Sequence, residues 1–209
     1  MRNPAIPGDR DGARCCAYNV GPPARPDCRR LPVPLEIERK FLVTDDRWRA
    51  LAERTLPMAQ GYLNDQASLD SGRQQVSVRV RLEGDEARLN LKSRDLGHTR
   101  EEYDYRIPVE DARALLARCV GGLIDKRRHF VTHAGRLWEV DEFRGDNAGL
   151  VVAEIELEAA DAPFEHPPWL GAEVTDTLRY YNLALATRPY SQWREDEREG
   201  RDLESPTCS

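Results

Sequence analysis

The chain has no long apolar run and no paired-cysteine motif, and these two absences narrow the class of protein. No stretch approaches the roughly 18 apolar residues of a membrane-spanning helix, and no signal-peptide-like apolar segment follows the N-terminus. No CxxC spacing occurs among the five cysteines, which argues against a zinc site or a disulfide framework. We therefore expect reduced thiols, a cytoplasmic location and no membrane partner.

An excess of positive charge is also absent. Lysine and arginine number 31 against 37 aspartates and glutamates, which gives a net charge of −6 at pH 7. A general nucleic-acid-binding protein has the opposite balance, so we expect no nucleic-acid partner. The 209 residues, of which 40% are hydrophobic and 33% charged, are enough for one substantial domain with tails.

The two ends of the chain differ in composition from its middle. Residues 1–34 are rich in proline and arginine without a periodic apolar pattern, which predicts a disordered extension. A basic docking arm, or a natural start near Val33, are alternatives that the sequence leaves open. Residues 190–209 are polar and mixed in charge, and we expect a flexible tail there. A single domain is predicted over residues 35–189.

Within this domain, apolar and charged residues alternate with a period of two. In the stretch Leu35–Val43, the charged residues Glu36, Glu38 and Lys40 share one face of a predicted strand. A helix would scatter these charges around its axis. The pattern returns over residues 60–63, 76–82, 87–93, 100–107, 123–133, 137–143 and 150–158, with tight turns predicted at Gly84-Asp85 and Ala134-Gly135. Helices are predicted between Thr44 and Pro57, over 109–120 and over 175–186.

The predicted helices carry apolar stripes, and we expect them to cover only the apolar faces of the strands. The charged faces would then look at one another across a closed or nearly closed sheet. Because buried unpaired charge is very costly, such an interior would hold water, ions and a charged ligand. Carboxylates suit hard cations such as Mg²⁺ or Mn²⁺, and arginine and lysine suit phosphate oxygens. The alternative is an open sheet whose charged face meets solvent.

Taken in order, these segments resemble the CYTH domain, the triphosphate tunnel metalloenzyme superfamily. The stretch Glu36-Ile37-Glu38-Arg39-Lys40 resembles the ExExK signature of that family. The later motifs are Gln60-Gly61-Tyr62-Leu63, Val78-Arg79-Val80-Arg81, Leu89-Asn90-Leu91-Lys92, Glu102-Tyr103-Asp104-Tyr105, Asp125-Lys126-Arg127-Arg128, Glu139-Val140-Asp141, Ala153-Glu154-Ile155-Glu156 and Glu173-Val174-Thr175. Two of these are similar to the short bacterial branch, whose characterised members are inorganic triphosphatases. The resemblance implies an α+β fold built on an eight-stranded antiparallel closed β-barrel with a charged interior and helices packed outside.

The resemblance also implies which residues act. It assigns metal binding to five acids, namely Glu36, Glu38, Asp141, Glu154 and Glu156. It assigns phosphate binding to seven basic residues, namely Lys40, Arg79, Arg81, Lys92, Lys126, Arg128 and Arg179. Lys40 and Tyr62 are the candidate catalytic residues, with Tyr62 as the proton acceptor. That role requires neighbouring cations to lower the tyrosine pKa from about 10, and the alternative is an edge tyrosine that packs at the tunnel mouth.

The activity implied is metal-dependent hydrolysis of a triphosphate by a metal-activated water. The expected substrate is inorganic tripolyphosphate, cleaved to pyrophosphate and phosphate. An adenylate cyclase, or a nucleoside or thiamine triphosphatase on the same scaffold, stays open because we find no base-reading motif. A protein that binds polyphosphate without turnover also stays open. A homodimer is compatible with the sequence, which has no feature that decides the oligomeric state.

Overall fold

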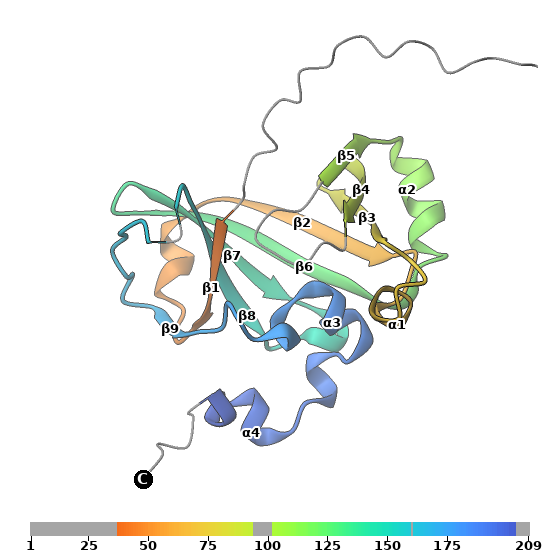
Figure 1. The fold of residues 1–209 in the computed structure, drawn as a ribbon. Helices are drawn as coiled ribbons and strands as arrows, with labels where there is room; N and C mark the ends of the chain where they lie inside the picture. The colour runs from red at the N-terminus through yellow and green to blue at the C-terminus, as the bar shows by residue number, and fades with distance from the viewer. Residues whose placement is uncertain (1–36, 94–101, 160, 204–209) are drawn as a thin grey trace, which may run out of the picture. The chain divides into compact units, whose positions relative to one another are not determined.

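A computed structural model describes residues 37–93, 102–159 and 161–203. They form one antiparallel sheet of nine strands with short helices around it (Figure 1). The strands are β1 (Ile37–Val43), β2 (Ala52–Tyr62), β3 (Val76–Glu83), β4 (Glu86–Ser93), β5 (Glu102–Arg106), β6 (Val120–His133), β7 (Arg136–Phe143), β8 (Val151–Leu157) and β9 (Leu170–Glu173). Their order across the sheet is β5-β4-β3-β2-β6-β7-β8-β1-β9.

The sheet is open, so the predicted closed eight-stranded barrel is wrong. Within the described part of the chain, β5 and β9 end the strand order at opposite edges and do not pair with each other. The reason is β9, a segment that the sequence analysis did not predict as a strand. It pairs with β1 at Phe41 and Val43. The edge of β1 that a closed barrel would join to β5 is therefore already taken.

Two tight turns set the register of the neighbouring hairpins, as predicted. Gly84 connects β3 to β4 with a φ of +57°, a conformation that glycine adopts without steric cost. Ala134 and Gly135 connect β6 to β7 with φ values of +48° and +76°. Positive φ at both central residues matches the twist of two antiparallel strands. These turns make β4 the antiparallel neighbour of β3, and β7 that of β6.

The helical segments are shorter than the sequence predicts. They are η1 (Arg47–Leu51), α1 (Gln66–Asp70), α2 (Val109–Leu116), η2 (Gly145–Asn147), η3 (Leu178–Tyr180) and α3 (Asn182–Thr187). The helix expected before Pro57 is wrong beyond Leu51, because β2 begins at Ala52 and runs through the proline. Pro57 has no N–H to donate to a neighbouring strand. It is tolerated there because the pairing of β2 with β3 begins only at the next residue, Met58. None of the helices in the described ranges has the length and apolarity to cross a bilayer.

Two apolar clusters cover the outer face of the sheet. On β3 and β4, Val80 and Ala87 pack with Ala112 and Leu116 of α2. On β1, β7 and β8 the cluster is built from Phe41, Trp138 and Ile155, which pack with Trp48 and Trp169 from connecting segments. These contacts agree with the prediction that α2 covers an apolar strand face.

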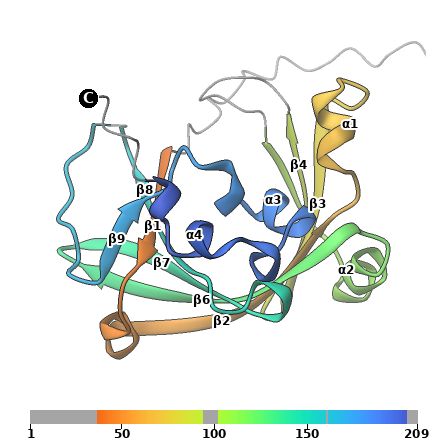
Figure 2. The same cartoon turned by 90° about the horizontal axis from the view of Figure 1, so that it is seen from below.

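The third apolar cluster lies on the opposite face, and its position corrects the prediction that every helix packs outside. Leu185 and Ala186 of α3 pack there with Tyr62, Ile124 and Phe143. Figure 2 shows α3 within the curve of the sheet, with β3 and β4 on one side and β1 and β8 on the other. One end of the inner face is therefore closed by α3.

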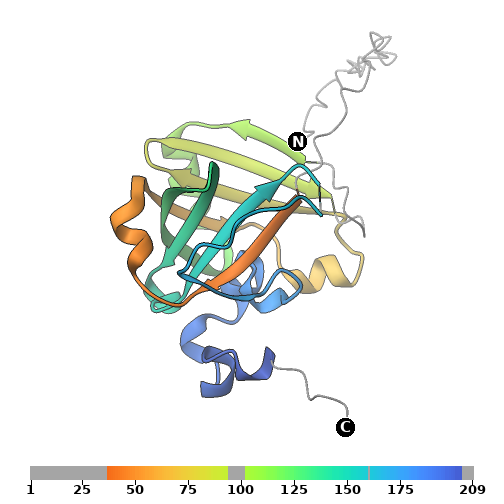
Figure 3. The same ribbon diagram turned by 90° about the vertical axis from the view of Figure 1, so that its left-hand side faces the viewer.

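The segment after residue 189 also differs from the flexible tail that its polar composition predicts. It contains η4 (Tyr190–Gln192), α4 (Glu195–Arg198) and η5 (Arg201–Leu203). Trp193 is only 4% exposed and packs edge-on against Tyr180 and Tyr190. Figure 3 shows this blue segment gathered on one side of the sheet.

Candidate active site

The strand register places most of the predicted site residues on the inner face of the sheet. Directly opposed residues of an antiparallel pair have side chains on the same side, and Lys40 opposes Glu154. Continuing from pair to pair follows one side of the sheet, and we call these residues on it the charged face: Glu38, Lys40, Gln60, Tyr62, Arg79, Arg81, Asn90, Lys92, Glu102, Lys126, Arg128, Glu139, Asp141, Glu154 and Glu156. Of the predicted residues, Glu36 lies outside the described ranges and Arg179 lies on η3 rather than on the sheet.

Four glutamates from three adjacent strands form the acidic part of this face. They are Glu38 on β1, Glu139 on β7, and Glu154 and Glu156 on β8. Desolvation and the neighbouring Glu154 raise the pKa of Glu38, although its side chain keeps contact with solvent. Burial raises the pKa of Glu139, and Glu154 and Asp141 add to this rise. Burial is the leading cause of both shifts, and the neighbouring carboxylates add to it.

This donor set fits a hard divalent cation by its chemistry. Carboxylate oxygens are the ligands that Mg²⁺ and Mn²⁺ prefer. A cation would favour the charged form of Glu38 and Glu139 and so oppose the rise in pKa that burial and the neighbouring carboxylates cause. Among the described residues, however, no group of three acidic, histidine or cysteine side chains is already gathered closely enough to hold a metal. The glutamates would therefore have to move together to bind one.

Two of the predicted metal ligands are bound by predicted phosphate ligands. Arg128 donates to both oxygens of Asp141, at 2.8 Å and 2.7 Å, and to Glu154 at 2.9 Å. Lys126 also forms an ion pair with Asp141, and Lys40 does so with Glu154. Burial alone would raise the pKa of Asp141, but Lys126 and Arg128 outweigh it and lower that pKa. Acids and bases thus neutralise one another across β1, β6, β7 and β8.

The opposite wall of the charged face carries basic groups that are less fully paired. Within the described residues, the Nε atoms of Arg79 and Arg81 are buried and have no hydrogen-bond partner, although Nε of Arg81 lies 3.6 Å from the carboxylate of Glu83. Burial and the neighbouring Arg79 lower the pKa of Arg81. Lys92 pairs with Glu102 at 2.9 Å. Unpaired guanidinium N–H groups beside one another favour binding of an anion.

Tyr62 is buried, and its surroundings do not favour the proton-acceptor role. Burial raises the pKa of its hydroxyl, and the attraction of the nearby Arg79 only partly opposes this rise. The cations are therefore close, as that role requires, but the net shift has the wrong sign. A phenol that stays protonated can instead donate a hydrogen bond. Its ring packs with Ile124 and Leu185.

Arg179 is engaged elsewhere. Its guanidinium donates to both oxygens of Asp202, at 2.5 Å and 2.8 Å. The same group lies 4.9 Å from the ring centre of Tyr180 and 5.2 Å from that of Trp193. Arg179, a predicted phosphate ligand, is thus bound to residues of the C-terminal segment in this structure.

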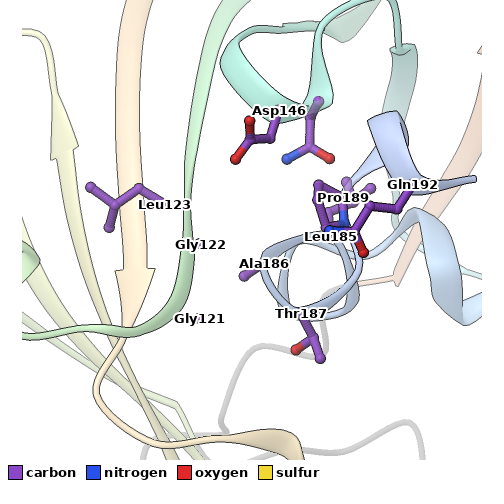
Figure 4. A pocket seen from close by; sticks show the side chains of 10 residues that line it. Gly121, Gly122, Leu123, Asp146, Leu185, Ala186, Thr187, Pro189 and Gln192 are labelled. Atoms are coloured by element: carbon purple, nitrogen blue, oxygen red, sulfur yellow. The ribbon is translucent and has the colours of Figure 1, made fainter.

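A cavity of about 210 Å³ lies apart from the charged face, where α3 meets the start of β6 (Figure 4). Its lining includes Gly121, Asp146 and Ala186, and none of the described residues that line it is lysine or arginine. It therefore lacks the positive charge that a polyphosphate needs. The charged face is the better candidate site.

Four residues of the charged face were not assigned to a site by sequence reasoning, and one of them is Glu102, which opposes Lys92. Glu139 stands two positions before Asp141 on β7, so the period-two pattern contained the signal that could have added it to the acids. Gln60 and Asn90 are almost fully buried and share the face with Arg79 and Arg81. Being neutral, they were invisible to a search for charge alternation.

An open antiparallel sheet with carboxylates on one wall and guanidinium groups on the other defines a class of protein suited to a metal-bound polyanion. The chain belongs to the CYTH domain family, whose family model matches residues 34–190. This match confirms the resemblance based on the ordered strand motifs.

Curated relatives agree with this assignment. The chain is 42% identical over 161 residues to an inorganic triphosphatase of Acetivibrio thermocellus. This alignment covers 77% of this chain and 98% of that protein. It is 38% identical over 154 residues to an inorganic triphosphatase of Nitrosomonas europaea, covering 72% and 96% respectively. The crystal structure of the inorganic triphosphatase NE1496 is similar with a TM-score of 0.56 and 35% identity, over 72% of this chain and 93% of that one.

Proposed function

We propose that this protein hydrolyses inorganic tripolyphosphate to pyrophosphate and phosphate, with Mg²⁺ or Mn²⁺ as the cofactor. The observation that carries the proposal is the charged face, which holds eleven of the thirteen predicted metal, phosphate and catalytic residues, all but Glu36 and Arg179. Two relatives named inorganic triphosphatases align with this chain over 98% and 96% of their length. The names of these two relatives support an enzyme rather than a protein that only binds polyphosphate.

The two walls divide the work between cation and substrate. Glu38, Glu154 and Glu156 would hold the divalent cation, with Glu139 beside them. When bound, this cation supplies positive charge that neutralises phosphate oxygens and polarises the reacting phosphoryl group. Arg79, which has a free Nε among the described residues, would hold phosphate oxygens from the other wall.

The basic groups that now pair with acids would change partners on binding. Arg128 has three carboxylates within ion-pair distance, those of Glu139, Asp141 and Glu154. A triphosphate carries more negative charge than any one carboxylate, and the acids released by this exchange would then be free to hold the divalent cation. The exchange keeps every buried charge compensated, which avoids the large cost of an unpaired ion in a desolvated site. Charge that develops in the transition state then meets Arg128 and Lys40 already in place.

Phosphate release from tripolyphosphate, ATP and thiamine triphosphate, each with Mg²⁺ or Mn²⁺, tests the proposal. We expect tripolyphosphate to give a kcat/KM at least about tenfold above the other two, and EDTA to abolish it. The double variant Glu38→Gln plus Glu156→Gln should lose activity by about 100-fold or more. Glu165→Gln is the matched control, because Glu165 is exposed and its carboxylate faces His133 outside the charged face.

The alternatives give different results in the same assay. Production of cyclic AMP from ATP would identify a cyclase. A clear preference for ATP or thiamine triphosphate would identify an organic triphosphatase. Tight binding of tripolyphosphate without phosphate release from any substrate would favour the binding protein and overturn the proposal.

A further inference from the structure

One neutral side chain lies in the middle of the charged face. Gln60 of β2 opposes Arg81 on β3 and Ile124 on β6, and it is only 1% exposed. Among the described residues, its amide nitrogen has no hydrogen-bond partner. Buried polar groups are nearly always paired in folded proteins, because an unpaired one destabilises the fold. Gln60 therefore needs an explanation that packing does not supply.

Close packing at Gly61, on the outer face of β2, fixes the position of the neighbouring Gln60. A Cβ atom added at the next residue, Gly61, would lie 2.7 Å from Sγ of Cys119 and 2.7 Å from Cδ2 of Leu123. Only glycine allows β2 to approach these outer residues so closely. Because side chains alternate along a strand, Gln60 and Tyr62 are held toward the charged face.

Asn64, another buried side-chain amide near the end of β2, has a structural role and can be compared with Gln60. Asn64 is 6% exposed and donates to Gln74 at 2.7 Å and to the carbonyl of Val76 at 2.8 Å. Its side-chain oxygen accepts from the backbone of Val78 at 2.8 Å. Asn64 is fully paired and ties the end of β2 to β3. The amide nitrogen of Gln60 has no such bond among the described residues, so the two amides serve different purposes.

The neighbours of Gln60 indicate which ligand it suits. The buried N–H donors without partners in the described chain include Gln60 Nε2, Arg79 Nε and Arg81 Nε, and Gln60 opposes Arg81 directly. A third cation at residue 60 would repel Arg79 and Arg81, whose positive charges already repel each other. An amide adds a hydrogen-bond donor without adding charge.

We infer that Gln60 is a substrate-binding residue whose amide donates to a phosphate oxygen held by Arg81. The inference rests on the proposed function, because the ligand it assigns is the triphosphate of that same site. It extends the site by a neutral contact that orients the phosphate, beside the cations that attract it. Stability of the free protein is lost at this position in exchange for a contact that forms only with the ligand.

Gln60→Met tests this inference, since methionine has a similar volume and no polar group to satisfy. We expect the melting temperature of the ligand-free protein to rise by about 2–4 °C. We expect affinity for tripolyphosphate, measured by calorimetry in EDTA, to fall by about 10- to 100-fold. With Mg²⁺ present, KM should rise by a similar factor. Gln60→Glu is a second variant, which should pair with Arg81, keep the fold stable and weaken binding further.

Asn64→Leu is the matched control. It should lower the melting temperature and leave affinity for tripolyphosphate within about twofold. The inference fails if Gln60→Met lowers the melting temperature of the free protein, as a structural amide would, or if affinity and KM both stay within twofold. If the wild-type protein neither binds nor hydrolyses tripolyphosphate, it is the proposed function that fails. If it does both and only Gln60→Met behaves like wild type, the function stands without this contact.

Discussion

Arg128 is the residue that connects the acidic and basic parts of the charged face. Its guanidinium forms ion pairs with Glu139, Asp141 and Glu154 on two neighbouring strands. Burial opposes its charge, but Asp141 and Glu154 outweigh burial and raise the pKa of Arg128 well above its ordinary value. Such a network is costly to break on one side, because the remaining partner stays buried without compensation.

The buried and exposed acids should therefore respond differently to substitution. Asp141→Ala leaves Lys126, which is only 1% exposed, without its partner and should lower the free energy of unfolding by about 3–5 kcal/mol. Glu156→Ala, at an exposed position, should change it by less than about 0.5 kcal/mol. Urea denaturation in EDTA measures both, and equal effects would contradict the buried network.

The raised pKa of Glu139 predicts a pH-dependent effect of its replacement. A carboxyl group with a higher pKa in the folded protein destabilises the fold as pH rises from its unfolded value, 4.5, through the folded one. Below 4.5 both states are protonated and the penalty vanishes. We expect Glu139→Gln to raise the free energy of unfolding at about pH 7, by up to about 1 kcal/mol, and to leave it unchanged near pH 3.5.

Calorimetry of the metal-free protein at the two pH values measures this difference. The control is Glu53→Gln, an exposed glutamate of β2, which should change stability by less than about 0.5 kcal/mol at either pH. A gain at low pH, or a loss at neutral pH, would show that the ion pair with Arg128 outweighs the burial of Glu139.

Among the elements, α3 and the helices after it depart most from what their sequence suggests. The polar composition after residue 189 indicates a tail, yet Tyr190 and Trp193 pack into the cluster that closes one end of the charged face. Two aromatic residues among many charged ones are too few to produce a periodic signal. Their burial depends on Tyr180 and Leu185, which are brought near only when α3 lies within the curved sheet.

Trp193→Ala should therefore destabilise the whole domain. Removing a buried tryptophan costs about 3–5 kcal/mol, and Trp193 is 4% exposed. Leu178→Ala, at a residue that is 76% exposed, is the control and should cost less than about 0.5 kcal/mol. Chemical denaturation compares the two. A flexible tail would make both variants as stable as the wild type.

At the scale of the whole molecule, the described strands form an open sheet in which β9 takes the free edge of β1. The family match covers residues 34–190, and residues Val33–Ser209 form a compact unit of their own. The parts that build the candidate site therefore all lie within this unit. The prolines and arginines of residues 1–32 contribute none of the predicted site residues.

Removal of residues 2–32 should leave the enzyme intact. We expect the kcat/KM for tripolyphosphate to stay within about twofold and the melting temperature within about 2 °C of the full chain, because the family match begins at residue 34 and every residue of the charged face lies after it. Parallel assays of the full and shortened chains provide the comparison. A large loss of affinity in the shortened chain would instead support the basic docking arm.

The charged face could be predicted from the sequence because its cause is local. Alternation of Glu38 with Lys40, or of Arg79 with Arg81, places each pair on one side of a strand wherever that strand lies. The hairpin turns at Gly84 and Gly135 are local for the same reason. These features, with the ordered motifs, were enough to identify the family.

Whether the sheet is open or closed, and which acids and bases pair within the site, depend on contacts between distant parts of the chain. Lys40 meets Glu154 across 114 residues of sequence, and β9 reaches β1 across a similar separation. Strand alternation sets which side a residue faces, but it cannot tell which strand occupies an edge or which cation reaches which carboxylate. Only the folded chain decides those, because edge pairing and charge neutralisation are settled by competition among all the strands at once.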